Sequence, residues 1–172
     1  MPKYRQDDDQ VSDGVNLLIS ILVRYPEIGT ISFDPNNESL KLTFMLSGIP
    51  TQPEFLTTKK LILSSIAAYH QLEGLNIHIT DVQLSTYENV AILNIFRDVA
   101  TLSKSEIAMI IALLRDKFKD RLVADLNDSM LEEDLLIQEE LIDNMLENIK
   151  KHHAAHCLIG IREDGRVLVF NK

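Results

Sequence analysis

The sequence has 172 residues, of which 45% are hydrophobic and 25% charged, and its formal net charge at pH 7 is −9. A chain of this length and composition is typical of one globular domain that folds without a metal or a disulfide. The excess of acidic residues disfavours nucleic acid as a partner, because a phosphate backbone attracts a basic surface. The densest basic stretch, 115–121, has acidic residues between its Arg and Lys residues, so we interpret it as a solvated helix face.

The sequence also indicates where the protein is located. Its first nine residues are polar and acidic, whereas a secretory signal peptide has an apolar core. The longest apolar run has eight residues, 107–114, and a membrane-spanning helix needs roughly 20. The single cysteine, Cys157, has no cysteine partner within the chain, which is typical of a reducing compartment. We therefore expect a cytoplasmic protein that does not use a membrane as a partner.

Periodicity divides the chain into four helices and about six strands. Apolar residues recur at steps of three and four where a helix is predicted, and every second residue is apolar in most of the predicted strands. Turn residues separate the segments. After a polar acidic tail at 1–9, the predicted helices cover about 10–25, 57–73, 103–121 and 129–153, and the predicted strands cover 31–33, 40–46, 75–79, 90–96, 158–161 and 166–170.

Two of these helices begin with a capping box, in which a Ser is followed three residues later by a Glu. Ser103 and Glu106 begin the third predicted helix, and Ser129 and Glu132 begin the fourth. The second helix has apolar residues on more than one face, so we expect it to be largely buried. The strand at 90–96 is apolar on both sides, which predicts a central strand with both faces covered.

The order of the segments is helix and then hairpin, three times, with one additional helix before the third unit. This order predicts an α+β fold: a single domain over 1–172, with an antiparallel sheet built from three helix–hairpin units and helices packed on one face. Residues 129–172 form the long helix and the C-terminal hairpin of that domain. The order resembles that of the small acidic chaperones that escort secreted proteins, and this resemblance implies a chaperone-like role.

The one dense group of potential metal ligands in the sequence is His-His-Ala-Ala-His-Cys at 152–157. On a helix His152 and His156 lie one turn apart, a spacing found in zinc sites, and Cys157 is a third candidate ligand. The glutamate of a His-Glu-x-x-His motif is absent, so metal-dependent hydrolysis is not indicated. In the alternative interpretation the histidines complement the helix dipole and Cys157 is a small buried residue. We expect no cofactor, with zinc at this cluster as the alternative.

Nothing in the sequence indicates a catalytic residue. A nucleophile elbow, a P-loop and a dinucleotide fingerprint are all absent from it. Runs of acidic residues, as at 7–9 and 132–134, are typical of solvated charge, and we interpret His70 and His78 as structural residues. An enzyme of unrecognised class stays an alternative, because catalytic residues that are distant in sequence leave no local pattern.

The fourth predicted helix has two apolar rows. The first is close to a heptad seam and consists of Leu131, Leu135, Ile142, Met145 and Ile149. The second consists of Met130, Leu136, Ile137, Leu141 and Leu146. A helix of this kind must bury both rows, and the third helix is also apolar over more than one face. We therefore predict a non-enzymatic interaction protein, a homodimeric protein-binding or chaperone-like scaffold, that binds a protein partner or a second copy through 103–121 and 129–153. The alternative is a small-molecule or metal-binding regulatory domain centred on 152–157.

Overall fold

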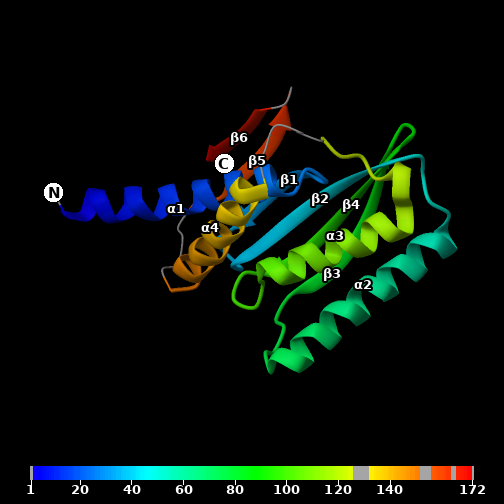
Figure 1. Cartoon of the computed structure of the whole chain (residues 1–172), viewed down its shortest axis with the longest axis horizontal. Helices are drawn as coiled ribbons and strands as arrows, with labels where there is room; N and C mark the ends of the chain where they lie inside the picture. Colours follow the sequence, from blue (N-terminus) through cyan, green and yellow to red (C-terminus); the bar gives the residue numbers. More distant parts are fainter. Residues whose placement is uncertain (1, 126–131, 152–155, 164–165, 172) are drawn as a thin grey trace.

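The computed structural model describes residues 2–125, 132–151, 156–163 and 166–171, and it has the predicted α+β class (Figure 1). In the described residues, four α-helices accompany one sheet of six antiparallel strands. The helices are α1 (Pro2–Arg24), α2 (Gln52–Glu73), α3 (Lys104–Phe118) and α4 (Glu132–Lys151), and a short 3-10 helix, η1 (Lys119–Arg121), follows α3. The strands are β1 (Ile28–Asp34), β2 (Ser39–Ser47), β3 (Thr80–Tyr87), β4 (Val90–Asp98), β5 (Leu158–Glu163) and β6 (Arg166–Asn171).

The sheet has the strand order β3-β4-β2-β1-β5-β6, so three hairpins lie side by side. The first and third predicted hairpins are confirmed as β1–β2 and β5–β6. Pairing of β2 with β4 and of β1 with β5 joins the hairpins into one sheet. These two pairings connect segments that are distant in the sequence, which is why local patterns do not predict the strand order.

One face of the sheet carries most of the hydrophobic core. Leu42 of β2 lies between Ile31 of β1 and Ile95 of β4, and all three side chains are fully buried. On the opposite face Lys41 is paired across the strands with Ser32 and Phe96, and these side chains are partly exposed. Because successive strand residues point to opposite faces, this pattern distinguishes a covered face from an open one.

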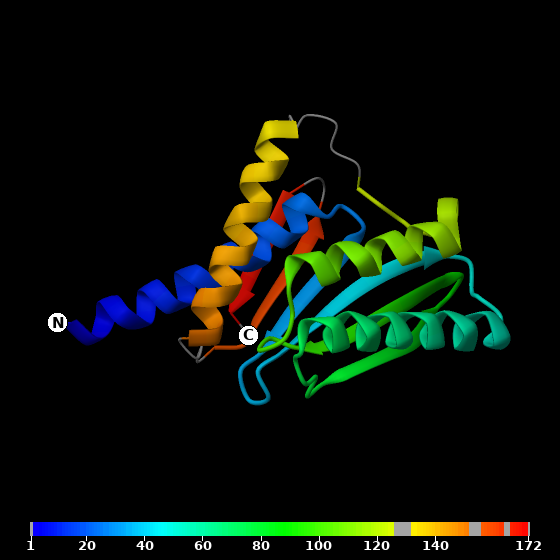
Figure 2. The ribbon, with the colours of Figure 1, turned by 60° about the horizontal axis from the view of Figure 1, so that its bottom comes forward.

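Contacts from α1, α2 and α3 all reach the covered face. Gly160 of β5 lies opposite Ile31, and a Cβ atom at that position would be 2.9 Å from Cδ1 of Leu22 in α1. Arg97 of β4, two residues after Ile95 on the same face, contacts His70 of α2 and Glu106 of α3. The fourth helix, α4, has its main contacts with α1 (Figure 2).

Two of the predicted helices begin earlier in the structure than the sequence indicated. The segment 2–9, predicted as a polar tail, belongs to α1, because apolar periodicity marks only the buried part of a helix and Pro2 suits a first helical turn. The second helix begins at Gln52 rather than near 57. Thr51 is its N-cap and accepts a hydrogen bond from the Glu54 N–H, and Pro53 lies in the first turn.

Three other expectations from the sequence are wrong. The strand predicted at 75–79 is Thr80–Tyr87, an edge strand whose polar residues give little alternation. Helix α2 is not largely buried, since Leu72 is 88% exposed and only one residue per turn is buried. Strand β4 has one open face, on which Ile92 and Phe96 are partly exposed, so Ile92 is not a core residue.

The apolar patterns of the sequence predict a core that includes Leu18, Leu22, Phe44, Ile66, Ile92, Ile111 and Leu114, and all of these residues except Ile92 are buried. Leu114 is fully buried in the second half of α3. We expect Leu114→Ala to lower the free energy of unfolding by about 2–5 kcal/mol, because it removes buried methyl groups and leaves a cavity. Urea denaturation followed by circular dichroism measures this loss. A loss below about 0.5 kcal/mol, the range of surface sites, would show that α3 is not part of the core.

Candidate functional site

Five polar side chains are buried together between α2, α3 and β4: His70, Arg97, Asp98, Thr101 and Glu106, all 6% exposed or less. Arg97 is at the centre of this cluster. Its Nε donates to Oε2 of Glu106 at 2.6 Å and its Nη2 donates to Oε1 at 2.8 Å, which makes the ion pair bidentate. Its Nη1 donates to the Ile79 carbonyl at 2.9 Å and also to Asp98. We call this group the Arg97 cluster.

Local sequence rules position each member of the Arg97 cluster. Arg97 follows Ala91, Leu93 and Ile95 in the inward register of β4. His70 is the last residue of the buried seam of α2, which recurs every four residues. Glu106 belongs to the predicted capping box, and its N–H donates to Oγ of Ser103 as expected. Its carboxylate contacts His70 and Arg97, so the second hydrogen bond of the box is replaced by a tertiary contact.

The carboxyl group of Asp98 closes the cluster on its β4 side. Burial alone would raise its pKa, but hydrogen bonds from Thr101 and from the Ile79 N–H, together with the charge of Arg97, hold the pKa below the ordinary value of 3.8. A carboxylate with a lowered folded-state pKa stabilises the fold at pH values above its unfolded-state pKa, and this contribution is lost as pH falls through the folded-state pKa.

We therefore expect acid to destabilise the wild type more steeply than Asp98→Asn, in the pH range below about 4. The variant is less stable at neutral pH but has no carboxyl group to protonate at this position. Urea denaturation at a series of pH values from 7 to 3 measures the two slopes. Parallel pH profiles for the two proteins would contradict this role of Asp98.

Chemically, the Arg97 cluster has the character of a structural site. Each of its side chains is almost completely enclosed, so a solute in the solvent has no access to them. Most of the donors of Arg97 are used within the protein, and the bonds join α2, α3, β4 and the residue that precedes β3. The burial of His70 agrees with its interpretation as a structural residue. His78, by contrast, is exposed and lies outside this cluster.

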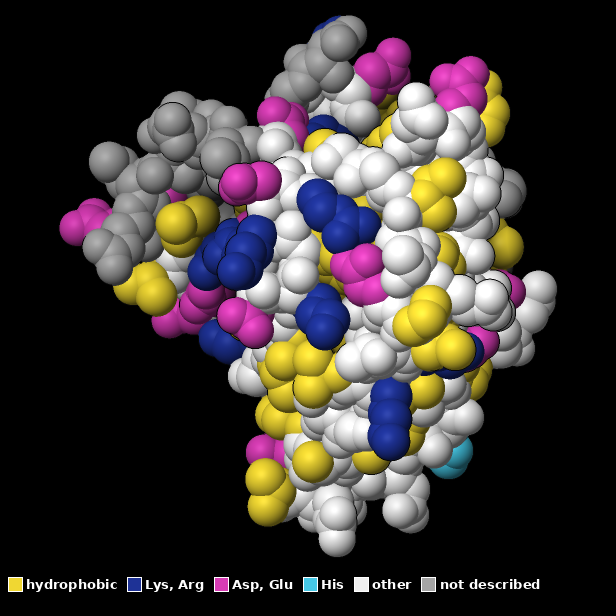
Figure 3. Space-filling model, turned by 90° about the vertical axis from the view of Figure 1, so that its right-hand side faces the viewer, with side chains coloured by type: hydrophobic (Ala, Val, Ile, Leu, Met, Phe, Trp, Pro, Cys, Tyr) yellow, Lys and Arg dark blue, Asp and Glu magenta, His cyan; other side chains and the backbone are white. Residues whose placement is uncertain are grey.

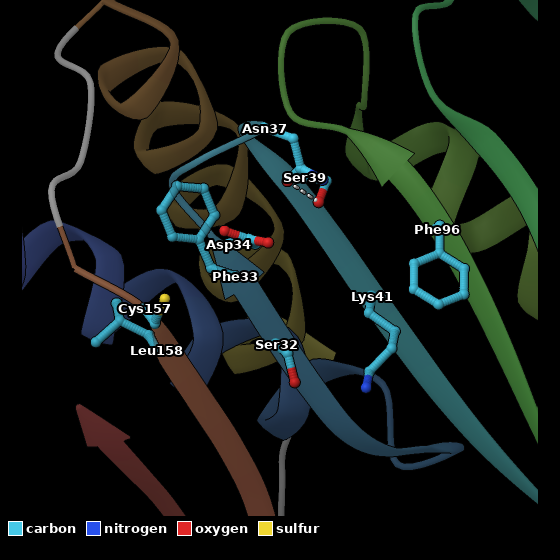
Figure 4. Close-up of a pocket in the computed structure, with 9 residues that line it drawn as sticks. All are labelled: Ser32, Phe33, Asp34, Asn37, Ser39, Lys41, Phe96, Cys157 and Leu158. Atoms are coloured by element: carbon cyan, nitrogen blue, oxygen red, sulfur yellow. Dashed lines mark hydrogen bonds between the residues drawn. The ribbon is translucent and has the colours of Figure 1, made fainter. Parts of the chain in front are cut away.

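A groove of about 250 Å³ lies at the end of strands β1, β2 and β5 (Figure 4). Lys41 and Phe96 line it from the open face of the sheet, and Asp34 and Ser39 line it from the last residue of β1 and the first residue of β2. Oγ of Ser39 donates to Asn37 at 2.6 Å, and this bond keeps the turn in place. The thiol of Cys157 lines the groove from the segment before β5. The volume is below the usual range of small-molecule pockets, about 300–1,000 Å³.

The predicted metal ligands are only partly within the described residues. His152 lies outside them, His156 is exposed and Cys157 is partly buried at the groove. Within the parts of the chain that the structure describes, no group of three His, Cys, Asp or Glu side chains is arranged to hold a metal ion. The zinc hypothesis at 152–157 therefore stays a prediction.

The two apolar rows of α4 have different environments. In the seam, Ile142, Met145 and Ile149 are buried, whereas Leu131 is outside the described residues. In the second row, Leu146 is buried, Met130 is outside the described residues, and Leu136, Ile137 and Leu141 are 58%, 55% and 42% exposed. The apolar residues of α3 are mostly buried, so the wide apolar surface of this helix packs within its own chain.

Acidic side chains surround the exposed residues of α4. Glu133, Asp134 and Glu140 are exposed, and none of the ion pairs between described residues uses them. Glu139 and Asp143 differ, because they pair with Arg24 of α1 and Lys104 of α3. We call the exposed set Glu133, Asp134, Leu136, Ile137, Glu140 and Leu141 the α4 outer face.

Basic side chains gather at another place, the end of the molecule where α3 and η1 meet the start of α2 (Figure 3). Arg115, Lys117 and Lys119 are exposed, as expected for a solvated basic stretch. Arg115 pairs with Glu27, and Arg121 donates to Glu54 at 2.7 Å. Much of the positive charge of this stretch is therefore balanced by acidic residues of the same chain.

None of the helices in the described residues is long and apolar enough to cross a membrane.

Comparisons with known proteins do not assign the chain to a family. No protein-family model, no curated protein and no solved structure matches this chain.

Proposed function

We propose that this chain is a non-enzymatic interaction module that binds a basic, amphipathic segment of a protein partner on the α4 outer face. The observation that supports it is the exposure of Leu136, Ile137 and Leu141 on a helix whose other side is buried. Apolar groups that are exposed next to each other and bordered by polar residues are typical of protein interaction sites.

Charge favours a basic partner over a second copy at this surface. Glu133, Asp134 and Glu140 form no ion pair with another described residue, so pairing two α4 outer faces would bring like charges together. A segment with Lys or Arg beside its apolar residues would satisfy both the charge and the apolar surface. A chaperone-like escort or an acidic scaffold acts in this way.

A titration with a defined probe tests the proposal. The probe is a synthetic amphipathic helix of about 18 Leu and Lys residues, and the control probe has the same residues in an order without an apolar face. We expect the amphipathic probe to bind more tightly, and added salt to weaken its binding because it screens the charges. The double variant Ile137→Asp and Leu141→Asp should weaken binding at least tenfold, about 1.4 kcal/mol.

The matched control for this titration is the double variant Leu56→Asp and Leu72→Asp on α2, which introduces the same two charges at residues that are 55% and 88% exposed. Binding that strengthens equally in both variants would show that net charge alone attracts the basic probe, because both variants add the same negative charge to the protein. Equal affinity for the two probes would contradict an apolar contact on α4.

A metal-binding regulatory function is the second candidate, because Cys157 lines the groove and His156 precedes it in the sequence. Metal analysis of freshly purified protein without an affinity tag distinguishes it. About one zinc ion per chain, lost in Cys157→Ser, would favour this second function. We expect the protein to be purified without stoichiometric zinc.

A further inference from the structure

Strand β6 ends the sheet, and among the described residues its outer edge lacks the features that usually protect such an edge. Its central residues, Val167 to Phe170, are all apolar, and the strand contains no proline or charged residue between its ends. Its pairing with β5 is continuous and has no bulge. Natural edge strands are usually protected by a charge, a proline, a bulge or a covering segment, because unpaired backbone groups attract another strand.

The hairpin register identifies the unpaired backbone groups. Glu163 faces Arg166 across a two-residue loop, so these residues form the closing hydrogen-bonded pair of the hairpin. Hydrogen-bonded and non-hydrogen-bonded pairs then alternate along the strands. The backbone N–H and C=O groups of Val167 and Val169 therefore point away from β5 and towards the open edge.

The other edge of the sheet, β3, is protected. The same alternation, counted from Tyr87 and Val90, places the N–H of Val82 on the open edge of β3. That N–H donates to Oδ1 of Asp81 at 2.8 Å. Asp81 also pairs with Lys59 of α2 at 3.4 Å, so charged side chains lie along this edge. The contrast identifies β6 as the edge that is free to accept a strand.

We propose that two copies of the chain associate by antiparallel pairing of their β6 strands, which joins the two sheets into one of twelve strands. The two-fold axis passes beside Leu168, so that Leu168 faces its copy and Val167 is hydrogen-bonded to Val169 of the other chain. In this register Arg166 faces Phe170, a favourable cation–π pairing, and no like charges meet. A shift of the register by four residues would place the Arg166 side chains of the two chains opposite each other, which is unfavourable.

The position of α1 agrees with this arrangement. Its amino-terminal end projects past the β6 edge of the sheet in both views (Figures 1 and 2). A two-fold axis perpendicular to the sheet keeps the helices of both copies on the same face. Each α1 would therefore extend over strands of the partner chain.

Sedimentation equilibrium of the full chain at micromolar concentration tests the assembly. We expect a mass of about 39 kDa, twice the 19.5 kDa of one chain. Val169→Pro removes one outward N–H, and it should give a folded monomer. Thr86→Pro, at an outward position of β3, is the matched control and should stay dimeric. Leu168→Lys is a second variant, for use if Val169→Pro does not fold. It places two like charges beside the two-fold axis and should also give a folded monomer.

Amide hydrogen exchange identifies the interface directly. The outward amides of Val167 and Val169 should be protected in the dimer and exchange rapidly on dilution below the dissociation constant, whereas the Thr86 amide should exchange rapidly at both concentrations. A wild type of 19.5 kDa, or a dimer whose Val167 and Val169 amides exchange rapidly, would overturn the proposal. The test is separate from that of the α4 outer face, because Ile137→Asp should leave the mass unchanged.

Discussion

Arg97→Met should lower the free energy of unfolding by about 3–5 kcal/mol, because breaking a buried ion pair leaves a charge without its partner. The guanidinium of Arg97 contacts both carboxylates of the Arg97 cluster, and neither Glu106 nor Asp98 has access to solvent. Methionine retains much of the side-chain length but supplies no donor. Urea denaturation followed by circular dichroism measures the loss.

Arg121→Met is the matched control for this variant. Arg121 also pairs with a glutamate, Glu54, but its side chain is 37% exposed. Ion pairs of this kind contribute about 0–1 kcal/mol, because water and salt screen them. A loss of stability in Arg97→Met that is no larger than in Arg121→Met would contradict the structural role of the Arg97 cluster.

A charged residue at the buried seam of α4 should unfold the protein or lower its stability by several kcal/mol. Ile142 is fully buried on the helix that packs against α1, so Ile142→Asp would place a carboxylate in an apolar contact. The same substitution at Ile137, which is 55% exposed, should change the free energy of unfolding by about 0.5 kcal/mol or less. Thermal and urea denaturation of the two variants measure the difference.

The pair of variants also tests which row of α4 is the outer one. If Ile142→Asp folded and Ile137→Asp did not, the row that contains Ile137 would be the buried side of α4 and the seam would be the exposed side. Similar effects of both substitutions would show that α4 is not packed on α1 by one face.

Local signals in the sequence predicted much of the fold. Ser103 and Glu106 fixed the start of α3, because an N-cap depends only on neighbouring residues. Strong alternation predicted β2 and the hairpin of β1 and β2. The register of Ala91, Leu93 and Ile95 also continues to Arg97, so a buried arginine was detectable as an inward position with the wrong polarity.

The rest of the structure depends on contacts between distant residues. The partner of Arg97 is Glu106, and the same glutamate also fits a capping box, so its sequence context indicates a different role. The strand order depends on pairing of β1 with β5, which are more than a hundred residues apart. In α4 both rows have similar residues, and only packing on α1 decides that Ile142 is buried and Ile137 is exposed.

Chemical-shift mapping of the amphipathic Leu/Lys probe on the isotope-labelled protein tests the proposed function most directly. We expect the largest shift changes on the α4 outer face, at Glu133, Ile137 and Leu141, with small changes at the basic end around Lys117 and Lys119. Shift changes centred on the groove at Lys41 and Phe96, or distributed over all acidic residues without preference for α4, would contradict it.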